Sequence, residues 1–279
     1  MKKMRFTKMH GAGNDFVLID DRDETFPARG SLIAAMAAEH VGIGCEGVIL
    51  LHRSSCADFR MMFYNPDGSE AELCGNGARC VAAFARRVGA VSSNSMTFET
   101  GAGLVDAEIV DEGLVKVWMP EPKDRKYGLA VTGDAGGAPV NGDFLVVGVP
   151  HFIVPVANVA KVDVTNAGRA LRLAEAFSPN GSNVDFVQYI PPNKAILRTY
   201  ERGVEAESGA CGTGAVATAV AGVEAHGMSL PMHVRSSQGY DLVVEGDYRQ
   251  SQGTGFTLTG PVCVIFEGEI DLDQLSIDE

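Results

Sequence analysis

The sequence lacks the usual marks of a membrane, secreted or metal-binding protein. No stretch approaches the ~18 apolar residues of a membrane-spanning helix, and the basic start MKKMRF is not followed by the apolar segment of a signal peptide. The chain has no CxxC pair and no HExxH motif, and the spacing from Cys74 to Cys80 does not suit a zinc site. We therefore expect a cytoplasmic protein without a metal ion.

Basic residues are also scarce. The chain has 23 Lys and Arg against 36 Asp and Glu, which gives a formal net charge of −13. Such a charge repels the phosphates of nucleic acids and anionic membrane surfaces, and it favours solubility. We expect neither nucleic acid nor membrane as a partner. The 279 residues, 46% of them hydrophobic, are enough for one large or two medium domains.

The cysteines are expected to be thiols, because disulfides are rare in a protein without a secretory signal. A single cysteine is more often a small buried residue than a catalyst. That interpretation is applied to Cys45, Cys56, Cys80 and Cys263.

The other two cysteines stand in a repeated motif. Cys-Gly-Asn-Gly-Ala at 74–78 matches Cys-Gly-Thr-Gly-Ala at 211–215, and the offset (211 − 74 = 137) is close to half of 279. Each motif follows a strand-like segment with an acidic turn and precedes an alanine-rich helical segment. The pattern predicts a duplicated unit, with the Pro- and Gly-rich stretch 120–143 as a boundary region.

Short β-type runs dominate the rest of the chain. Besides the helices after the two motifs, we expect helices at 31–41 and 165–177. Many strands with few helices favour an α+β architecture over repeated βαβ units. The runs that predict strands are 16–20, 47–52, 59–64, 96–100, 113–119, 144–149, 183–190, 195–200, 240–246 and 262–268.

A thiol at the first turn of a helix is suited to proton transfer. The positive end of the helix dipole stabilises a thiolate, so we expect the pKa of such a cysteine to fall below the free value of ~8.5. The glycines beside it let backbone N–H groups approach a carboxylate or phosphate. Neither motif ends in the Lys-Ser/Thr of a phosphate-binding loop, which makes a nucleotide a poor fit.

Two such thiols on opposite sides of one ligand would suit a racemase, which removes a proton from one face of a carbon and delivers one to the other. Backbone amides on the carboxylate would stabilise the charge that develops, so no cofactor is required. Three other interpretations stay open: glycines that only close a strand-to-helix turn, a protein that merely binds a carboxylate, and a thiol-redox protein.

Five segments, in order, resemble the diaminopimelate epimerase family. They are MHGAGNDFVLID, NPDGSEAELCGNGARC, GVPHF, NVDFVQ and RTYERGVEAESGACGTGAVA. Members of that family interconvert LL- and meso-diaminopimelate without pyridoxal phosphate, on the path to lysine and peptidoglycan precursors. The resemblance covers essentially the whole chain.

The resemblance implies a role for particular residues. Cys74 and Cys211 would be the acid/base pair, with His151 and Glu201 assisting them. The α-carboxylate of the reacting centre would be held at Gly75, Asn76, Gly212 and Thr213. The unreactive end of diaminopimelate would be held by Asn14, Asn65, Asn183, Glu201 and Arg202. On the residues alone, Asn14 and Asn65 are equally typical of turns, and His151 of a protein core.

The resemblance also implies a fold of two pseudo-symmetric halves, each a mixed β-sheet wrapped around a central α-helix, with the site in the cleft between them. The halves would be 1–118 with 262–279, and 119–261. We expect a homodimer, the commonest soluble assembly. Val149 and Gly47 depart from the common family forms, which keeps open a related racemase acting on another amino acid.

Overall fold

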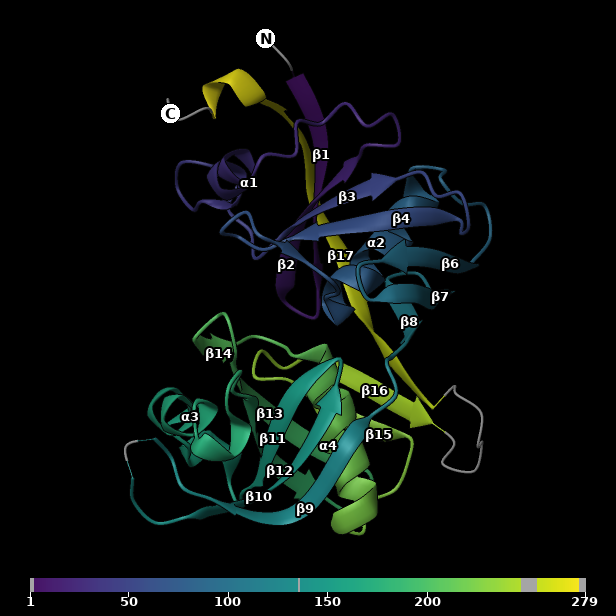
Figure 1. Cartoon of the computed structure of the whole chain (residues 1–279). Helices are drawn as coiled ribbons and strands as arrows, with labels where there is room; N and C mark the ends of the chain where they lie inside the picture. The colour runs from purple at the N-terminus through teal and green to yellow at the C-terminus, as the bar shows by residue number, and fades with distance from the viewer. Residues whose placement is uncertain (1–2, 135, 247–254, 276–279) are drawn as a thin grey trace. The chain divides into compact units, whose positions relative to one another are not determined.

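The computed structural model describes residues 3–134, 136–246 and 255–275. Its contacts divide the chain into two compact units (Figure 1). Unit 1 is Met1–Val117 with Pro261–Glu279, and unit 2 is Trp118–Gly260. Within the described ranges, no helix has the length and apolar character needed to cross a membrane.

In its described residues, unit 1 is a mixed sheet with two α-helices and a 3₁₀ turn at Leu272–Gln274. The hairpin β1–β2 pairs with the last strand of the chain, and both helices connect strands of the sheet. In chain order its elements are β1 (Lys3–Gly11), β2 (Asn14–Asp20), α1 (Gly30–Ala37), β3 (Val48–His52), β4 (Phe59–Tyr64), β5 (Glu70–Ala71), α2 (Gly75–Arg87), β6 (Ser95–Thr100), β7 (Gly103–Asp111) and β8 (Leu114–Trp118).

Unit 2 is built in the same way. The strand that ends it, β17, continues into unit 1. In chain order its elements are β9 (Lys123–Val131), β10 (Val140–Val147), β11 (Val149–Pro155), α3 (Val164–Arg172), β12 (Asn183–Ile190), β13 (Lys194–Glu201), β14 (Ala206–Ser208), α4 (Gly212–Ala225), β15 (Met232–Arg235), β16 (Asp241–Gly246) and β17 (Phe256–Asp271).

The order of strand pairing is repeated in the two units. In unit 1, β2 and β3 are parallel, β4 lies antiparallel to both β3 and β5, and β6 is parallel to β4 and antiparallel to β7. In unit 2, β11 and β12 are parallel, β13 lies antiparallel to both β12 and β14, and β15 is parallel to β13 and antiparallel to β16. The duplication that the cysteine motifs indicate therefore extends to the whole strand–helix arrangement.

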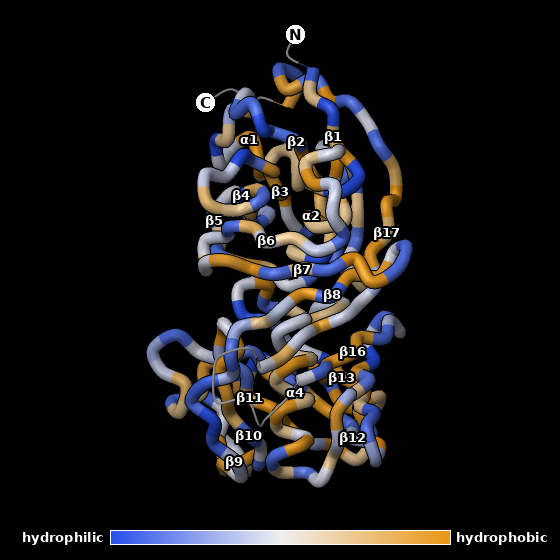
Figure 2. The backbone as a smooth tube through the Cα atoms, turned by 90° about the vertical axis from the view of Figure 1, so that its right-hand side faces the viewer, coloured by the Kyte–Doolittle hydropathy of each residue, from blue (hydrophilic) through white to orange (hydrophobic). Residues whose placement is uncertain are grey.

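The helix that follows each cysteine lies in the core of its unit. Helix α2 packs on β1, β2, β3, β4 and β7, and helix α4 packs on β10–β13, β15 and β16. Most residues of both helices are buried, which agrees with their alanine, glycine and valine content, because small side chains let strands approach from several sides. Figure 2 shows hydrophobic residues recurring along α4 and the neighbouring β10 and β11.

Several predicted boundaries differ from the structure. Helix α1 ends at Ala37 because Ala38 is extended and His40 has a φ of +68°, so 38–41 is not helical. The predicted helix 165–177 is instead α3 and a separate 3₁₀ turn at Glu175–Phe177. The predicted strand 144–149 spans the turn between β10 and β11, where Gly148 has a φ of +69°.

The stretch 120–143 is not only a boundary. Residues Lys123–Val131 form β9, which pairs antiparallel with β10. Its side chains are mostly exposed, so the strand depends on main-chain hydrogen bonds and shows no apolar alternation that a sequence pattern could detect. The change of unit lies before this stretch, between Val117 and Trp118.

Candidate active site

Both motif cysteines are the N-cap residues of buried helices, as the sequence predicts. Cys74 has φ −126° and ψ 120° before α2, and Cys211 has φ −113° and ψ 109° before α4. In each case the cysteine carbonyl accepts the first helical hydrogen bond, from Ala78 N–H at 2.7 Å and from Ala215 N–H at 3.0 Å. Extended backbone followed by a glycine at the first helical position is what an N-cap requires.

In unit 1 the first thiol is held by side-chain amides. The Cys74 thiol donates to Asn14 Oδ1 at 3.6 Å, and Asn76 Nδ2 donates to the same oxygen at 3.1 Å. Asn14 Nδ2 donates in turn to a Glu46 carboxylate oxygen. Three of the residues predicted for the site, Cys74, Asn14 and Asn76, are thus brought together.

A buried cation supports these amides. Arg79 is fully buried in α2, and its Nη2 donates to Asn76 Oδ1 at 2.7 Å while its Nη1 donates to the Gly75 carbonyl at 3.5 Å. Burial lowers the pKa of Arg79 to about 10, so the side chain is still charged at neutral pH, and negative charge on Cys80 or Cys74 would stabilise it. The sequence interpretation assigned Arg79 no role; its only signal is a charge on a helix face that is otherwise apolar.

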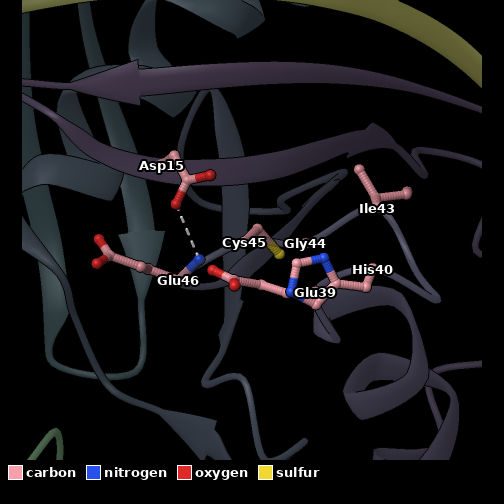
Figure 3. A pocket seen from close by; sticks show the side chains of 7 residues that line it. All are labelled: Asp15, Glu39, His40, Ile43, Gly44, Cys45 and Glu46. Carbon is pink, nitrogen blue, oxygen red and sulfur yellow. Dashed lines mark hydrogen bonds between the residues drawn. The ribbon is translucent and has the colours of Figure 1, made fainter.

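The loop between α1 and β3 forms a small pocket beside this cluster (Figure 3). Asp15 and Glu46 meet there, because the Glu46 N–H donates to Asp15 Oδ1 at 3.1 Å. Burial raises the pKa of Glu46, and Asn14 and Lys8 partly offset that rise. The pocket is lined by Asp15, Glu39, His40, Ile43, Gly44, Cys45 and Glu46.

Packing accounts for Gly47, one of the two departures from the common family form. A Cβ atom at this position would lie 2.6 Å from a ring carbon of Phe63 and 3.2 Å from one of Phe16. Real Cβ atoms do not approach other atoms that closely, so a larger residue requires those rings to move. The glycine therefore fits the two phenylalanines that surround it.

In unit 2 the second thiol stands at the end of a series of hydrogen-bonded side chains, which we call the buried chain. Cys211 Sγ lies 3.5 Å from Thr213 Oγ1, which lies 3.0 Å from His151 Nε2. His151 Nδ1 lies 2.6 Å from Asp185 Oδ2, and the Thr199 hydroxyl donates to the other oxygen of Asp185 at 2.6 Å. His151 and Asp185 are completely buried and Thr199 is 2% exposed. The chain runs from the thiol into the core.

The pKa of Cys211 corrects the expectation drawn from the helix start. Burial raises it well above the ordinary thiol value, and the charges of Glu201 and Asp185 raise it further. The Thr213 hydroxyl and the Gly214 N–H, which donates to the sulfur at 3.4 Å, act in the opposite direction. Desolvation and two carboxylates outweigh the helix terminus, so the prediction of a lowered pKa is wrong for Cys211.

The remaining predicted residues fall into two places. In unit 2, Asn183 Oδ1 accepts the Arg202 N–H at 2.7 Å, and Asn183 lies opposite His151 in the parallel pair β11–β12. Glu201 is the last residue of β13 and acts on Cys211 through its charge. In unit 1, the Asn65 amide donates to Ser69 Oγ at 3.0 Å within a turn after β4.

The predictions for the other four cysteines are half correct. Cys45 and Cys80 are buried, as expected. Cys56 and Cys263 are exposed, so the interpretation of these two as core residues is wrong. Cys56 follows β3 in a surface loop, and Cys263 lies on an outward-facing position of β17.

Comparison with known proteins shows the family to which the chain belongs. The family model described as diaminopimelate epimerase matches residues 6–123 and 144–257. A diaminopimelate epimerase of Aquifex aeolicus is 42% identical over 285 residues, covering 98% of this chain and 99% of its own length. Diaminopimelate epimerases of Desulforudis audaxviator and Gemmatimonas aurantiaca are each 38% identical, covering 95% and 96% of this chain and 99% of their own lengths.

Solved structures with the same fold are more distant in sequence. A phenazine biosynthesis protein of the PhzF family from Bacillus anthracis has a TM-score of 0.74 at 19% identity, covering 97% of this chain and 99% of its own. A hydroxyproline epimerase from Agrobacterium vitis has a TM-score of 0.72 at 19% identity, covering 96% of this chain and 92% of its own. These likenesses show the fold, and the family model and the close relatives show the lineage: the chain belongs to the diaminopimelate epimerase family.

Proposed function

We propose that the protein interconverts LL- and meso-diaminopimelate without a cofactor, with Cys74 and Cys211 as the acid/base pair. The observation that carries the proposal is the matched position of the two thiols, each the N-cap of a buried helix in one of two duplicated units of a diaminopimelate epimerase family member. Each unit supplies one thiol. In this proposal the halves of the protein are the two units, and each sheet wraps its central helix, α2 or α4.

The proton balance of the reaction needs only these two groups. One cysteine, as thiolate, takes the proton from Cα and becomes a thiol, while the other gives its proton to the opposite face and becomes a thiolate. The two then have exchanged states and are ready for the reverse reaction. A thiol is a suitable acid and base here because its ordinary pKa lies within reach of neutral pH.

The helix starts would hold the reacting centre. Backbone N–H groups at Gly75 and Asn76 in α2 and at Gly212 and Thr213 in α4 lie in first turns, at the positive end of the helix dipole. They are suited to bind the α-carboxylate and to stabilise the negative charge that develops on it when Cα loses its proton.

The unreactive end of diaminopimelate has a carboxylate and an ammonium group, and a polar set of residues would recognise it. The Arg202 guanidinium can bind a carboxylate through two parallel hydrogen bonds, and the Glu201 carboxylate can balance an ammonium group. Asn14, Asn65 and Asn183 complete this proposed set, because an amide can donate or accept as required.

One substitution favours a second candidate, a racemase of another amino acid. Val149 is the first residue of β11, two positions before His151, and many family members have asparagine there. Loss of one amide hydrogen bond would weaken binding of the distal group by about 1 kcal/mol. A panel of stereopure amino acids separates this candidate from the first.

The experiment that tests the function is incubation of the reduced protein with LL-diaminopimelate in D2O. We expect meso-diaminopimelate with deuterium at the inverted carbon, and a rate of epimerisation about 10²–10⁴-fold lower in Cys74→Ala and in Cys211→Ala. Cys56→Ala, which removes an exposed thiol, is the matched control and should behave as the parent does. Epimerisation that survives the loss of either motif thiol would overturn the acid/base assignment, and exchange with another amino acid alone would overturn the substrate.

A further inference from the structure

The duplicated strand pairing makes each position in one unit comparable with a position in the other. Val48 pairs with Tyr64 in unit 1, and Val184 pairs with Tyr200 in unit 2. One residue further along β3 and β12, the partners are Ile49 with Phe63 and Asp185 with Thr199. In the parallel pairs, Val17 lies opposite Val48 as Phe152 lies opposite Val184, so Phe16 corresponds to His151.

The helices support the same correspondence. A Cβ atom at Gly77 in α2 would lie 3.1 Å from the end of Ile49, and a Cβ atom at Gly214 in α4 would lie 2.8 Å from Oδ1 of Asp185. Each glycine stands three residues after its cysteine. Ile49 and Asp185 therefore occupy corresponding positions, each next to the helix glycine that follows the cysteine by three residues.

The fold itself does not need polar residues at these positions. In unit 1 they are Phe16 and Ile49, both fully buried, and Phe63, which is 7% exposed. The rings of Phe16 and Phe63 pack edge to face with centroids 6.1 Å apart. In unit 2 the same row is His151, Asp185 and Thr199, and a buried carboxylate is costly unless its hydrogen bonds are satisfied. Unit 2 thus has costly buried polar residues at the positions where unit 1 has apolar ones.

We propose that Asp185 and Thr199 are positioning residues for the second thiol, and that they keep Cys211 protonated in the free protein. The proposal deepens the proposed function, since it assigns Cys211 as the resting acid. It rests on the direction of the hydrogen bonds in the buried chain.

That direction follows from the carboxylate. An ionised carboxylate only accepts hydrogen bonds, so at 2.6 Å from Asp185 the Nδ1 atom of His151 carries a proton, and in a ring with no second proton Nε2 is an acceptor. The Thr213 hydroxyl then donates to Nε2, and its oxygen is left to accept the proton of the Cys211 thiol. The Thr199 hydroxyl fixes the other oxygen of Asp185 and so fixes the carboxylate that starts the chain. With the bonds in this order the Thr213 oxygen favours the thiol, whereas a Thr213 hydroxyl that donates to the sulfur favours the thiolate.

The charges around the sulfur act in the same sense. Glu201 and Asp185 are the carboxylates that act on Cys211, and burial disfavours its thiolate as well. The groups that favour the thiolate are the N-terminus of α4, through the Gly214 N–H, and a Thr213 hydroxyl turned toward the sulfur. Asp185 fixes the His151 tautomer in which the Thr213 hydroxyl turns away from the sulfur and toward Nε2.

Asp185→Asn is the variant that would reverse the direction of the hydrogen bonds in the buried chain with little change of side-chain shape. The amide nitrogen can donate to His151 Nδ1, so Nε2 would carry the ring proton and Thr213 would donate to the sulfur. The negative charge is also lost, and both changes favour the thiolate. We expect alkylation of Cys211 by iodoacetamide, followed by peptide mass spectrometry across pH, to shift to lower pH and to be about tenfold faster at pH 7.

The same measurement contains its controls. Alkylation of Cys74 in Asp185→Asn should keep the midpoint of the parent, and Ile49→Val, at the corresponding place in unit 1, should leave both midpoints unchanged. Thr199→Val should shift Cys211 in the same direction by less, and Thr199→Ser should behave as the parent does. If Asp185→Asn does not fold, the comparison of Thr199→Val with Thr199→Ser tests the proposal.

The outcomes separate this proposal from its alternatives. An unchanged Cys211 midpoint in both Asp185→Asn and Thr199→Val would overturn it, and a midpoint at higher pH would mean that the His151–Asp185 pair activates the thiolate instead, as in catalytic triads. Alkylation is measured without substrate, so the proposal and the epimerase function can each fail alone. With diaminopimelate, the high-pH limb of kcat/KM should also move to lower pH in Asp185→Asn, which a merely structural role would not cause.

Discussion

The row of buried residues below each cysteine differs most between the two units. In unit 1 it is Phe16, Ile49 and Phe63, and the thiol above it meets the amides of Asn14 and Asn76. In unit 2 the corresponding row is His151, Asp185 and Thr199, connected to Cys211 through Thr213. Identical strand order and helix position thus support two chemistries, because the fold fixes where the thiol lies and the neighbouring side chains fix which protonation state is favoured.

The helices themselves differ in the same way. Arg79 in α2 stands five positions after Cys74, and Val216 in α4 stands five positions after Cys211; both are completely buried. A buried guanidinium favours negative charge on the sulfur nearby, whereas the carboxylates of unit 2 disfavour it. The chemistry of a racemase treats two faces of one carbon alike, yet its resting state must be unequal, with one proton shared between two sites.

Loss of either thiol should have the largest effect. Cys74→Ala and Cys211→Ala each remove one partner of a proton transfer, for which we expect a fall in kcat of about 10²–10⁴-fold. The readout is the rate of meso-diaminopimelate formation from the LL isomer. If one variant retained most of the rate, the pairing of the two units in the reaction would be disproved.

Replacing the two corresponding glycines, Gly214 and Gly77, with alanine should lower the free energy of unfolding by different amounts. Gly214→Ala would bring a methyl group 2.8 Å from Asp185 Oδ1 and 3.2 Å from Cys211 Sγ, so we expect a loss of about 1–3 kcal/mol in the free energy of unfolding. At Gly77 the neighbours are the ends of Ile49 and Met61, at 3.1 and 3.2 Å, which can move. Gly77→Ala should therefore stay within about 1 kcal/mol of the parent, since alanine also favours the helix. Urea unfolding measures both, and equal losses would contradict the difference in rigidity.

Removing the buried cation should affect only the first thiol. Arg79→Met leaves Asn76 Oδ1 without its donor from Arg79 and takes away the positive charge of α2. We expect Cys74 to be alkylated several-fold more slowly at neutral pH while Cys211 is unchanged, and Arg79→Lys to recover part of the rate because it keeps the charge. A uniform change at both cysteines would indicate a general loosening of the protein.

The raised pKa of Cys211 should be visible as a dependence of stability on pH. The folded protein keeps this proton at pH values above the ordinary thiol pKa, whereas the unfolded chain releases it. The stabilising contribution is therefore complete below pH 9 and is lost as the pH rises toward the folded value, by up to about 1.4 kcal/mol per pH unit. Cys211→Ala should show a flatter decline between pH 9 and 10 than the parent does. An identical decline would show that the proton is not retained.

The sequence predicts the parts of this molecule that depend on local pattern. The glycines after Cys74 and Cys211 predict both helix starts, and the apolar runs predict β4 and β12 with the bounds that the structure has. It does not predict β9, whose side chains are exposed and whose pairing is made by the main chain. Local pattern carries no information about such a strand.

Asp185 and Arg79 escaped sequence interpretation for another reason. Asp185 stands in NVDFVQ between two apolar residues, where an alternating strand would place a surface position, and only the pairing of β12 with β11 and β13 shows it to be buried beside His151 and Thr199. The raised pKa of Cys211 likewise comes from burial and from Glu201, ten positions away in sequence. Electrostatics at a thiol depend on the completed fold, and a motif shows only the helix terminus.

The most direct test of this asymmetry is a site-resolved alkylation of the parent protein from pH 6 to 11, followed by peptide mass spectrometry. The midpoint of the pH profile, unlike the rate itself, is independent of how accessible each sulfur is to the reagent. We expect a midpoint for Cys211 well above the ordinary thiol value and above that of Cys74. A midpoint for Cys211 at or below that of Cys74 would contradict it.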